Sequence, residues 1–316
     1  MVDSVDKKIL FELEKNARIS DVKLAKLTRK SKDAVRYRIK KLEEEGIITE
    51  YKTWIDFTKL GYKTATFYLK TKNIAEQINA LSQEVQKNPN TYWLGLAHGQ
   101  WNVGITYFVK TNEDIVKIKK DLQEAYIDII IDLHIVFLTS LGVQDKKFLQ
   151  KTSSGLSFFT EKTTNEELDV LSKNILSLFY SNARLSLAKI AHQLNISVDK
   201  VQLRVKRLKE RGIIVRYSAR IDYNKLGYEY YKTHIYLKNK KSVQKIYSYV
   251  ESTTDMINVL EQIAPWDMEI VQFNTSFQEY TMSLEKFSKA FADDIERTDF
   301  SAMYLDIIYP CKKMPS

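Results

Sequence analysis

The sequence predicts an α+β protein in which two three-helix units alternate with two sheet-containing domains along one chain. Three observations support this fold class: a long internal repeat, apolar residues at helical spacing early in each repeat, and β-branched or aromatic apolar runs later in each repeat. A chain of 316 residues is also too long for one ordinary domain.

The internal repeat decides the expected domain organisation. Residues 16–62 match residues 182–228 at a constant offset of 166, with 23 identities in 47 positions and no gap. Between the two copies, a segment rich in Lys, Ser and Thr is predicted to be a linker. The predicted units are a first head (1–60), a first sheet domain (61–141), the linker (142–164), a second head (165–226) and a second sheet domain (227–312).

The overall composition is that of a folded globular protein. The sequence contains no stretch long and apolar enough to cross a membrane, and residues 1–6 lack the apolar core of a signal peptide. The single cysteine, Cys311, excludes an internal disulfide framework and Cys-rich zinc sites, and fits a reducing compartment. We therefore expect a soluble cytoplasmic protein without a metal or other cofactor.

Each head is predicted to contain three helices followed by an extended segment. In the first head, apolar residues recur at helical spacing over residues 4–16, and Ser20 and Ser31 are typical N-caps for the second and third helices. Gly46 is suited to the left-handed conformation that follows a helix. The segment 47–57 is predicted to be extended and to form a wing.

The second head repeats this pattern. Thr164 and Glu167 have the spacing of a capping box before its first helix, and Ser197 is the expected N-cap of its third helix. Three helices with a tight turn between the second and third, followed by a β-ribbon, describe a winged helix-turn-helix, whose third helix enters the major groove of DNA.

The third helices are strongly basic. The net charge of +9 comes entirely from residues 1–52 and 165–217, whose basic excesses are four and five. A solvated basic helix is the alternative explanation, but the recurrence of the basic face in both copies favours double-stranded DNA as the partner. The predicted DNA-binding residues are Ser31, Lys32, Arg36, Tyr37, Arg38, Lys40, Lys41, Ser197, Lys200, Gln202, Leu203, Arg204, Lys206 and Arg207.

The two third helices differ at the positions expected to read bases. The first copy carries Lys, Arg and Tyr where the second carries Val, Gln and Leu, at Lys32, Arg36, Tyr37 and Val198, Gln202, Leu203. We therefore expect the two heads to prefer different half-sites and the natural operator to be asymmetric.

An ordered set of motifs recurs in both copies. The first copy carries Asn16-Ala17-Arg18, Arg38-Ile39-x-x-Leu42-x-x-x-Gly46-Ile47-Ile48 and Leu60-Gly61-Tyr62, and the second copy repeats them from Asn182, Arg204 and Leu226. This set resembles the leucine-responsive regulator (Lrp/AsnC) family of transcription regulators. The resemblance implies a tandem duplication in which each wing is followed by a βαββαβ ferredoxin-like (RAM/AsnC-type) domain that senses ligands and oligomerises.

The rest of the sequence predicts the same order of elements independently. In the first sheet domain, strands are predicted at 64–70, 92–98, 101–110 and 129–138, and helices at 74–87 and 113–126, with Gly99-Gln100 as a hairpin turn. In the second, strands are predicted at 232–238, 256–263, 266–274 and 301–309, and helices at 242–251 and 277–294. An antiparallel sheet with helices on one face leaves its other face to be buried.

That face can be buried within one chain or between chains. The two sheet domains can pair with each other, or each can pair with a domain of another chain. We favour the intramolecular pair because tethering gives it a high effective concentration. By resemblance, we expect the chain to assemble further into a homo-oligomer.

A small-molecule effector is a further expectation from the resemblance. The family binds effectors, commonly amino acids, near the hairpin of its sensor domain, where it carries a Gly, an aromatic residue two positions later and then an Asp. The first copy lacks the Asp and the second lacks the Gly, so a structural hairpin with an anchoring Trp is the alternative. The candidate effector residues are Gly99, Trp101, Asn102, Trp266 and Asp267.

Two other functions compete with regulation. One branch of the same superfamily resembles sirohaem decarboxylases, which would use His and Arg on the sheet domains; the other alternative is an interaction protein that does not bind DNA. The histidines are His98, His134, His192 and His234, and they share no spacing. The sequence shows no phosphate loop, metal-binding helix pair or nucleophile elbow, so we expect no enzyme activity.

Overall fold

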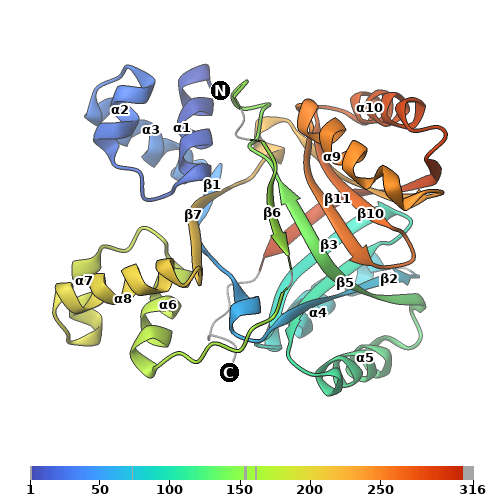
Figure 1. The fold of residues 1–316 in the computed structure, drawn as a ribbon, viewed down its shortest axis with the longest axis horizontal. Helices are drawn as coiled ribbons and strands as arrows, with labels where there is room; N and C mark the ends of the chain where they lie inside the picture. Colours follow the sequence, from blue (N-terminus) through green and yellow to red (C-terminus); the bar gives the residue numbers. More distant parts are fainter. Residues whose placement is uncertain (1, 73, 153–154, 161, 309–316) are drawn as a thin grey trace.

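The structure is a computed structural model that describes residues 2–72, 74–152, 155–160 and 162–308. The chain contains both helices and antiparallel strands, which confirms the predicted α+β fold class. Figure 1 shows the two three-helix heads on one side of the molecule and the strands, flanked by helices, on the other. The first head contains α1 (Ser4–Lys15), α2 (Asp21–Thr28) and α3 (Lys32–Glu44), and the second contains α6 (Val170–Ser181), α7 (Leu187–Leu194) and α8 (Val198–Glu210).

Side-chain caps fix where most of these helices begin. The hydroxyls of Ser20, Ser31 and Ser197 accept backbone N–H groups from the first turns of α2, α3 and α8, as predicted. The expected capping box of Thr164 and Glu167 is wrong, because Asp169 is the N-cap of α6. The backbone N–H of Thr164 instead bonds to the first copy, at the carbonyl of Thr58.

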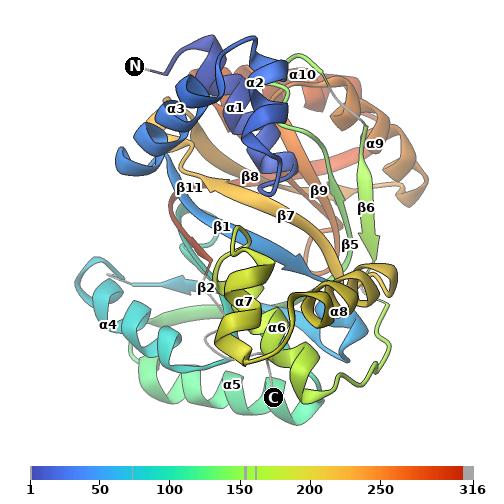
Figure 2. The same cartoon turned by 90° about the vertical axis from the view of Figure 1, so that its left-hand side faces the viewer.

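The extended segments after α3 and α8 pair with each other. Strand β1 (Ile48–Ile55) runs antiparallel to β7 (Ile214–Ile221) and forms a two-stranded ribbon. Both segments are extended, as predicted, but neither head forms its ribbon alone: each head supplies one strand, and the other copy supplies its partner. A lone strand leaves its backbone groups unpaired, and this exchange satisfies them. In Figure 2 the ribbon lies between the heads, on the face toward the larger sheet.

The larger sheet closes into an eight-stranded ring. The strand order is β2-β4-β3-β11-β8-β10-β9-β5, and β5 also pairs with β2. The strands are β2 (Lys63–Thr71), β3 (Thr91–Gly99), β4 (Val103–Val109), β5 (Ile130–Val143), β8 (Glu229–Leu237), β9 (Met256–Ile263), β10 (Met268–Asn274) and β11 (Ile295–Ile308). Because β5 pairs with β9 and β11 pairs with β3, the two sheet domains are joined within one chain, as favoured from the sequence.

The remaining elements surround this barrel. Helices α4 (Ile74–Lys87), α5 (Asn112–Tyr126), α9 (Val243–Ser252) and α10 (Phe277–Ala290) lie on its outside, and short 3-10 turns span Phe57–Lys59, Asn224–Leu226 and Lys240–Ser242. None of the helices in the described ranges has the length and apolarity needed to span a bilayer.

Strands β5 and β11 differ from their predicted bounds of 129–138 and 301–309. Each is longer because its two halves pair with different neighbours: β5 with β2 and then β9, and β11 with β8 and then β3. The predicted last residue of the final strand, Tyr309, and the predicted domain end at residue 312 lie outside the described residues.

The segment predicted as a linker is held against both copies. Its strand β6 (Ser157–Thr160) pairs with the end of β5, and Leu149 is buried in the core of the first head. The ammonium of Lys146 lies 3.6 Å from the carboxylate of Glu14 on α1. Much of this segment is therefore packed structure, not a free tether.

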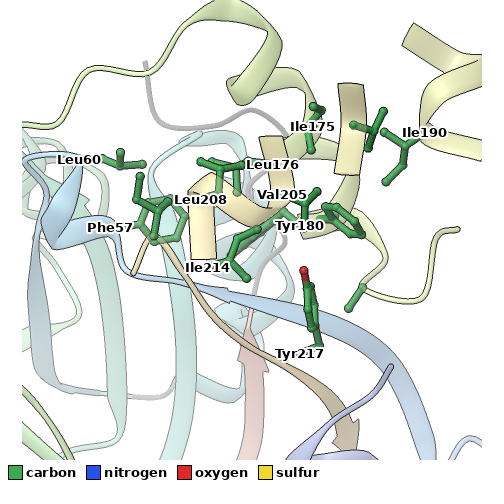
Figure 3. Packing of buried hydrophobic residues seen from close by; sticks show 14 of the residues in the cluster. Phe57, Leu60, Ile175, Leu176, Tyr180, Ile190, Val205, Leu208, Ile214 and Tyr217 are labelled. Atoms are coloured by element: carbon green, nitrogen blue, oxygen red, sulfur yellow. The ribbon is translucent and has the colours of Figure 1, made fainter. Parts of the chain in front are cut away.

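The hydrophobic cores cross the boundary between the copies. The core of the second head includes Phe57 and Leu60 from the first copy, which pack near Leu208 and Ile214 (Figure 3). The core of the first head likewise includes Ala219 and Ile221 of β7. Each head is thus completed by residues of the other copy.

Candidate nucleic-acid interface

Helix α3 presents one basic face to solvent. Its buried face consists of Val35, Ile39 and Leu42, which follow one another at helical spacing against the head core. The opposite face is exposed and carries five of the predicted DNA-binding residues, Lys32, Arg36, Tyr37, Lys40 and Lys41. A helix with this width and charge fits the major groove.

Two lysines of this exposed face form weak ion pairs with glutamates at the end of the same helix. Lys40 pairs with Glu44 at 3.4 Å and Lys41 with Glu45 at 3.8 Å, both along the helix surface. Exposed pairs of this kind contribute about 0.3–0.5 kcal/mol and are screened by salt. Both lysines can therefore exchange these partners for phosphates at little cost.

Arg38 and Arg204 do not belong to the exposed faces. The guanidinium of Arg38 donates to Asp3 at 2.8 Å and to Asp6 at 2.7 Å, both at the start of α1. Arg204, its counterpart in the second head, donates to Asp169 and Ser172 at the start of α6. The structure uses these two predicted DNA contacts to join the first and third helices of each head, so we leave them out of the proposed interface.

The exposed face of α8 is less polar than that of α3. Val198 and Leu203 remain 41% and 48% exposed, in the positions of Lys32 and Tyr37. The other predicted residues of this face, Lys200, Gln202, Lys206 and Arg207, are also exposed, and Lys206 pairs with Glu210 at 3.7 Å. The two heads therefore present different chemistry on the same scaffold.

The repeated Asn-Ala-Arg turns lock the two heads together. The backbone N–H of Ala17 donates to the carbonyl of Tyr217 at 3.0 Å, and that of Ala183 donates to the carbonyl of Tyr51 at 2.8 Å. Arg18 adds two bonds from Nη1 to the carbonyls of Ala183 and Leu185, at 2.6 and 2.7 Å. Sequence reasoning marked this motif as a repeat but missed its role at the junction of the heads.

Comparisons with known proteins identify the family. A family model described as winged helix-turn-helix DNA-binding matches residues 2–49 and 168–215, one match in each head. The HTH-type transcriptional regulator LrpA of Pyrococcus abyssi is 34% identical over 118 residues, which are 37% of this chain and 83% of LrpA. The chain belongs to the Lrp/AsnC family. A second relative, an uncharacterised HTH-type transcriptional regulator of Pyrococcus furiosus, is 32% identical over 127 residues, covering 80% of its length.

The whole two-copy arrangement of this Lrp/AsnC chain also occurs in a solved structure. The crystal structure of the siroheme decarboxylase NirDL, in complex with an iron-uroporphyrin III analogue, aligns with 96% of this chain and 92% of its own, with a TM-score of 0.64. The sequence identity is 16%, so this likeness shows a shared fold.

In this Lrp/AsnC protein, the polar side chains of the two hairpins form hydrogen bonds with the backbone of neighbouring strands. The side-chain amide of Asn102 accepts from the N–H of Thr71 at 2.8 Å and donates to the carbonyl of Thr71 at 2.9 Å. At the equivalent place, the carboxylate of Asp267 accepts from the N–H of Leu237 at 2.8 Å. Both side chains thus hold the end of a neighbouring strand.

The aromatic residues of the two hairpins lie inside the barrel. Trp101 and Trp266 are buried, with their ring centroids 6.3 Å apart. Gly99 has a φ of +134°, and a Cβ there would lie 2.3 Å from the carbonyl oxygen of Phe300, which explains the glycine without a ligand. These contacts support the structural explanation of the hairpins.

A buried charged cluster lies beside the two tryptophans. The Lys232 ammonium is 2.8 Å from the Glu269 carboxylate, which also accepts from the Tyr68 hydroxyl at 2.9 Å and has His234 at 3.5 Å. Burial alone would raise the pKa of Glu269, but Lys232 and His234 together lower it to about 2. Tyr68 comes from the first copy and the others from the second, so this cluster joins the two sheet domains.

The remaining histidines share no site. His98 stacks on Tyr304, His134 packs against Trp101, and His192 is exposed on α7. The interior around His234 is filled by aromatic rings of Tyr68 and Trp266. Within the described ranges, no group of His, Cys, Asp and Glu is arranged to hold a metal ion.

Proposed function

We propose that this Lrp/AsnC protein is a sequence-specific transcription regulator whose two heads bind different half-sites of one asymmetric operator. The observation that carries the proposal is the divergence of α3 and α8. Both helices occupy the same place in equivalent heads, yet Lys32, Arg36 and Tyr37 are replaced by Val198, Gln202 and Leu203 on the exposed face. Arg prefers guanine and Gln prefers adenine in the major groove.

The fixed relation of the two heads supports this proposal. The ribbon β1–β7 and the reciprocal Asn-Ala-Arg turns hold both heads of one chain together. In such a frame, half-site spacing is set by the protein, and each half-site always meets a defined head. One chain therefore places two recognition helices on DNA, as a symmetric dimer does, but the two helices present different side chains to the bases.

The test begins with selection of bound fragments from genomic DNA, followed by footprinting on the selected operator. Arg36→Ala is expected to weaken binding by about 1–3 kcal/mol and to relax specificity in one half-site only. Gln202→Ala is expected to do the same in the other half-site. A strictly palindromic footprint, with both halves bound equally after either substitution, would contradict the proposal.

Control by an amino acid is tested in the same experiment. At the hairpins, an effector would have to displace the backbone bonds made by Asn102 and Asp267. We therefore expect the selected fragments to be the same with and without added amino acids. A change in the fragment pool on adding one amino acid would show that an effector acts on this protein.

A further inference from the structure

A cationic cavity lies at the junction of the two heads. It has a volume of about 390 Å³ and lies beside the first turns of α2 and α3. Four basic side chains line it: Arg18, Lys32 and Arg36 from the first head, and Arg184 from the second. Among the described residues that line it, Asp21 is the only acidic one.

One carboxylate cannot balance four cations. Asp21 lies 2.7 Å from the Nε of Arg36 and 3.6 Å from Nη2 of Arg184, and it orients both guanidinium groups. Burial lowers the pKa of Arg18; Tyr217 opposes this shift, and the nearby charge of Arg184 adds to it. This repulsion between two arginines would be relieved by an anion bound between them.

Apart from Asp21, neutral groups hold Arg18 and Arg184 in place. Arg18 donates from Nη1 to two backbone carbonyls and lies over the ring of Phe179 at 5.1 Å. Arg184 donates to the hydroxyl of Tyr51 at 3.3 Å and lies over that ring at 5.0 Å. These contacts position the positive charges without neutralising them.

The equivalent place in the second head has different chemistry. The positions of Asp21, Lys32 and Arg36 are occupied there by Leu187, Val198 and Gln202. The cationic cavity is therefore not a by-product of the head fold, since the second head keeps the fold but has no charged side chain at these three positions. Guanidinium groups beside the N-terminus of a helix are the usual partners of a phosphate group.

We propose that this cavity binds one backbone phosphate of the DNA held by the first head, and that Arg184 of the second head completes the site. The proposal rests on the proposed function and adds to it a contact that couples the heads. Lys32 and Arg36 join the cavity to the exposed face of α3, so a duplex on that face brings its phosphates to the cavity mouth.

The experiment measures the affinity of the full chain for a mixed-sequence duplex as a function of salt. Arg184→Met is expected to make the slope of log affinity against log salt shallower by about one, because one phosphate contact is lost. Lys32→Met, at the exposed first residue of α3, is expected to give the same change. The double variant is expected to lose about one in slope, not two, because both side chains serve the same phosphate.

The matched control is Lys120→Met, which removes one exposed positive charge from α5 on the far side of the barrel and should leave the slope unchanged. If the wild-type chain does not bind duplex, the proposed function itself fails. If it binds and the slope is unchanged in both single variants, or falls by two in the double variant, the phosphate site is overturned. Thermal stabilisation by orthophosphate alone, lost in Arg184→Met while the DNA slope stays unchanged, would overturn the assignment to the duplex.

Discussion

Arg36 and Arg38 are two positions apart on α3 and have different surroundings. Residues at this separation point to nearly opposite sides of a helix. Arg36 is exposed beside Asp21, whereas Arg38 reaches the carboxylates of Asp3 and Asp6 at the start of α1. Sequence reasoning placed both arginines at the DNA, because the acidic partners of Arg38 lie far away in the chain and carry no local signal.

Replacing Arg38 with Ala separates its structural role from DNA binding. We expect the substitution to lower the free energy of unfolding by about 1 kcal/mol, since it removes two partly exposed charged hydrogen bonds. The salt dependence of DNA binding should stay as in the wild type. Chemical denaturation and a salt titration of DNA binding measure the two effects.

Lys40→Ala is the matched control for that experiment. It removes an exposed charge from the same helix, so we expect unchanged stability and a salt slope shallower by about one. If Arg38→Ala flattened the slope and Lys40→Ala did not, the assignment of the exposed face would be wrong.

Among the strands, β4 and β10 show how the two copies diverged inside the barrel. Gly104 on β4 and Glu269 on β10 occupy equivalent positions opposite Tyr68 and His234. The glycine leaves room for Trp93, since a Cβ at Gly104 would lie 2.6 Å from that ring. At the equivalent position, Glu269 instead places a carboxylate in the interior, where it pairs with the ammonium of Lys232.

The fit between Gly104 and Trp93 is open to a direct test. We expect Gly104→Ala to lower the free energy of unfolding by about 1–3 kcal/mol, because the added methyl group overpacks a filled interior. Chemical denaturation of the single and double variants measures this. Adding Trp93→Leu should recover part of the loss, and additive losses in the double variant would contradict a shared cause.

At the scale of the whole molecule, the barrel exists only when both sheet domains are present. Its ring of strands closes through β5–β9 and β3–β11, and the cluster of Tyr68, Lys232, His234 and Glu269 spans the two domains. The head cores cross the same boundary through Phe57 and Ile221. These contacts thus join the two copies into one internally paired unit.

Glu269→Gln tests the contribution of the buried cluster. We expect a loss of about 3–5 kcal/mol in the free energy of unfolding at neutral pH, because the substitution leaves the buried Lys232 ammonium unpaired. The double variant Lys232→Met with Glu269→Leu should recover most of this loss, since the ammonium and the carboxylate are then both removed from the interior. Equal losses in the single and double variants would contradict the explanation.

The same cluster predicts how stability depends on pH. The pKa of Glu269 falls from 4.5, its ordinary value, to about 2 in the folded protein. Its stabilising contribution is therefore complete above about pH 4.5 and is lost as the pH falls from 4.5 toward 2. The difference in unfolding free energy between wild type and Glu269→Gln should shrink as the pH falls from 4.5 toward 2, as measured by denaturation at a series of pH values.

The sequence by itself determined the duplication, the α+β class, the serine caps of α2, α3 and α8, and the basic face of α3. All of these depend on residues close together in the chain, whose spacing and chemistry carry the information. The family followed from the same local motifs.

Only the tertiary structure decided which strands pair, which arginines face solvent and what fills the barrel. The exchange of β1 with β7, the turning of Arg38 and Arg204 toward the first helices, and the burial of Trp101 and Trp266 all join residues distant in sequence. Pairings of this kind are selected by packing and by the need to satisfy buried polar groups, and neither requirement can be seen within a short window of sequence.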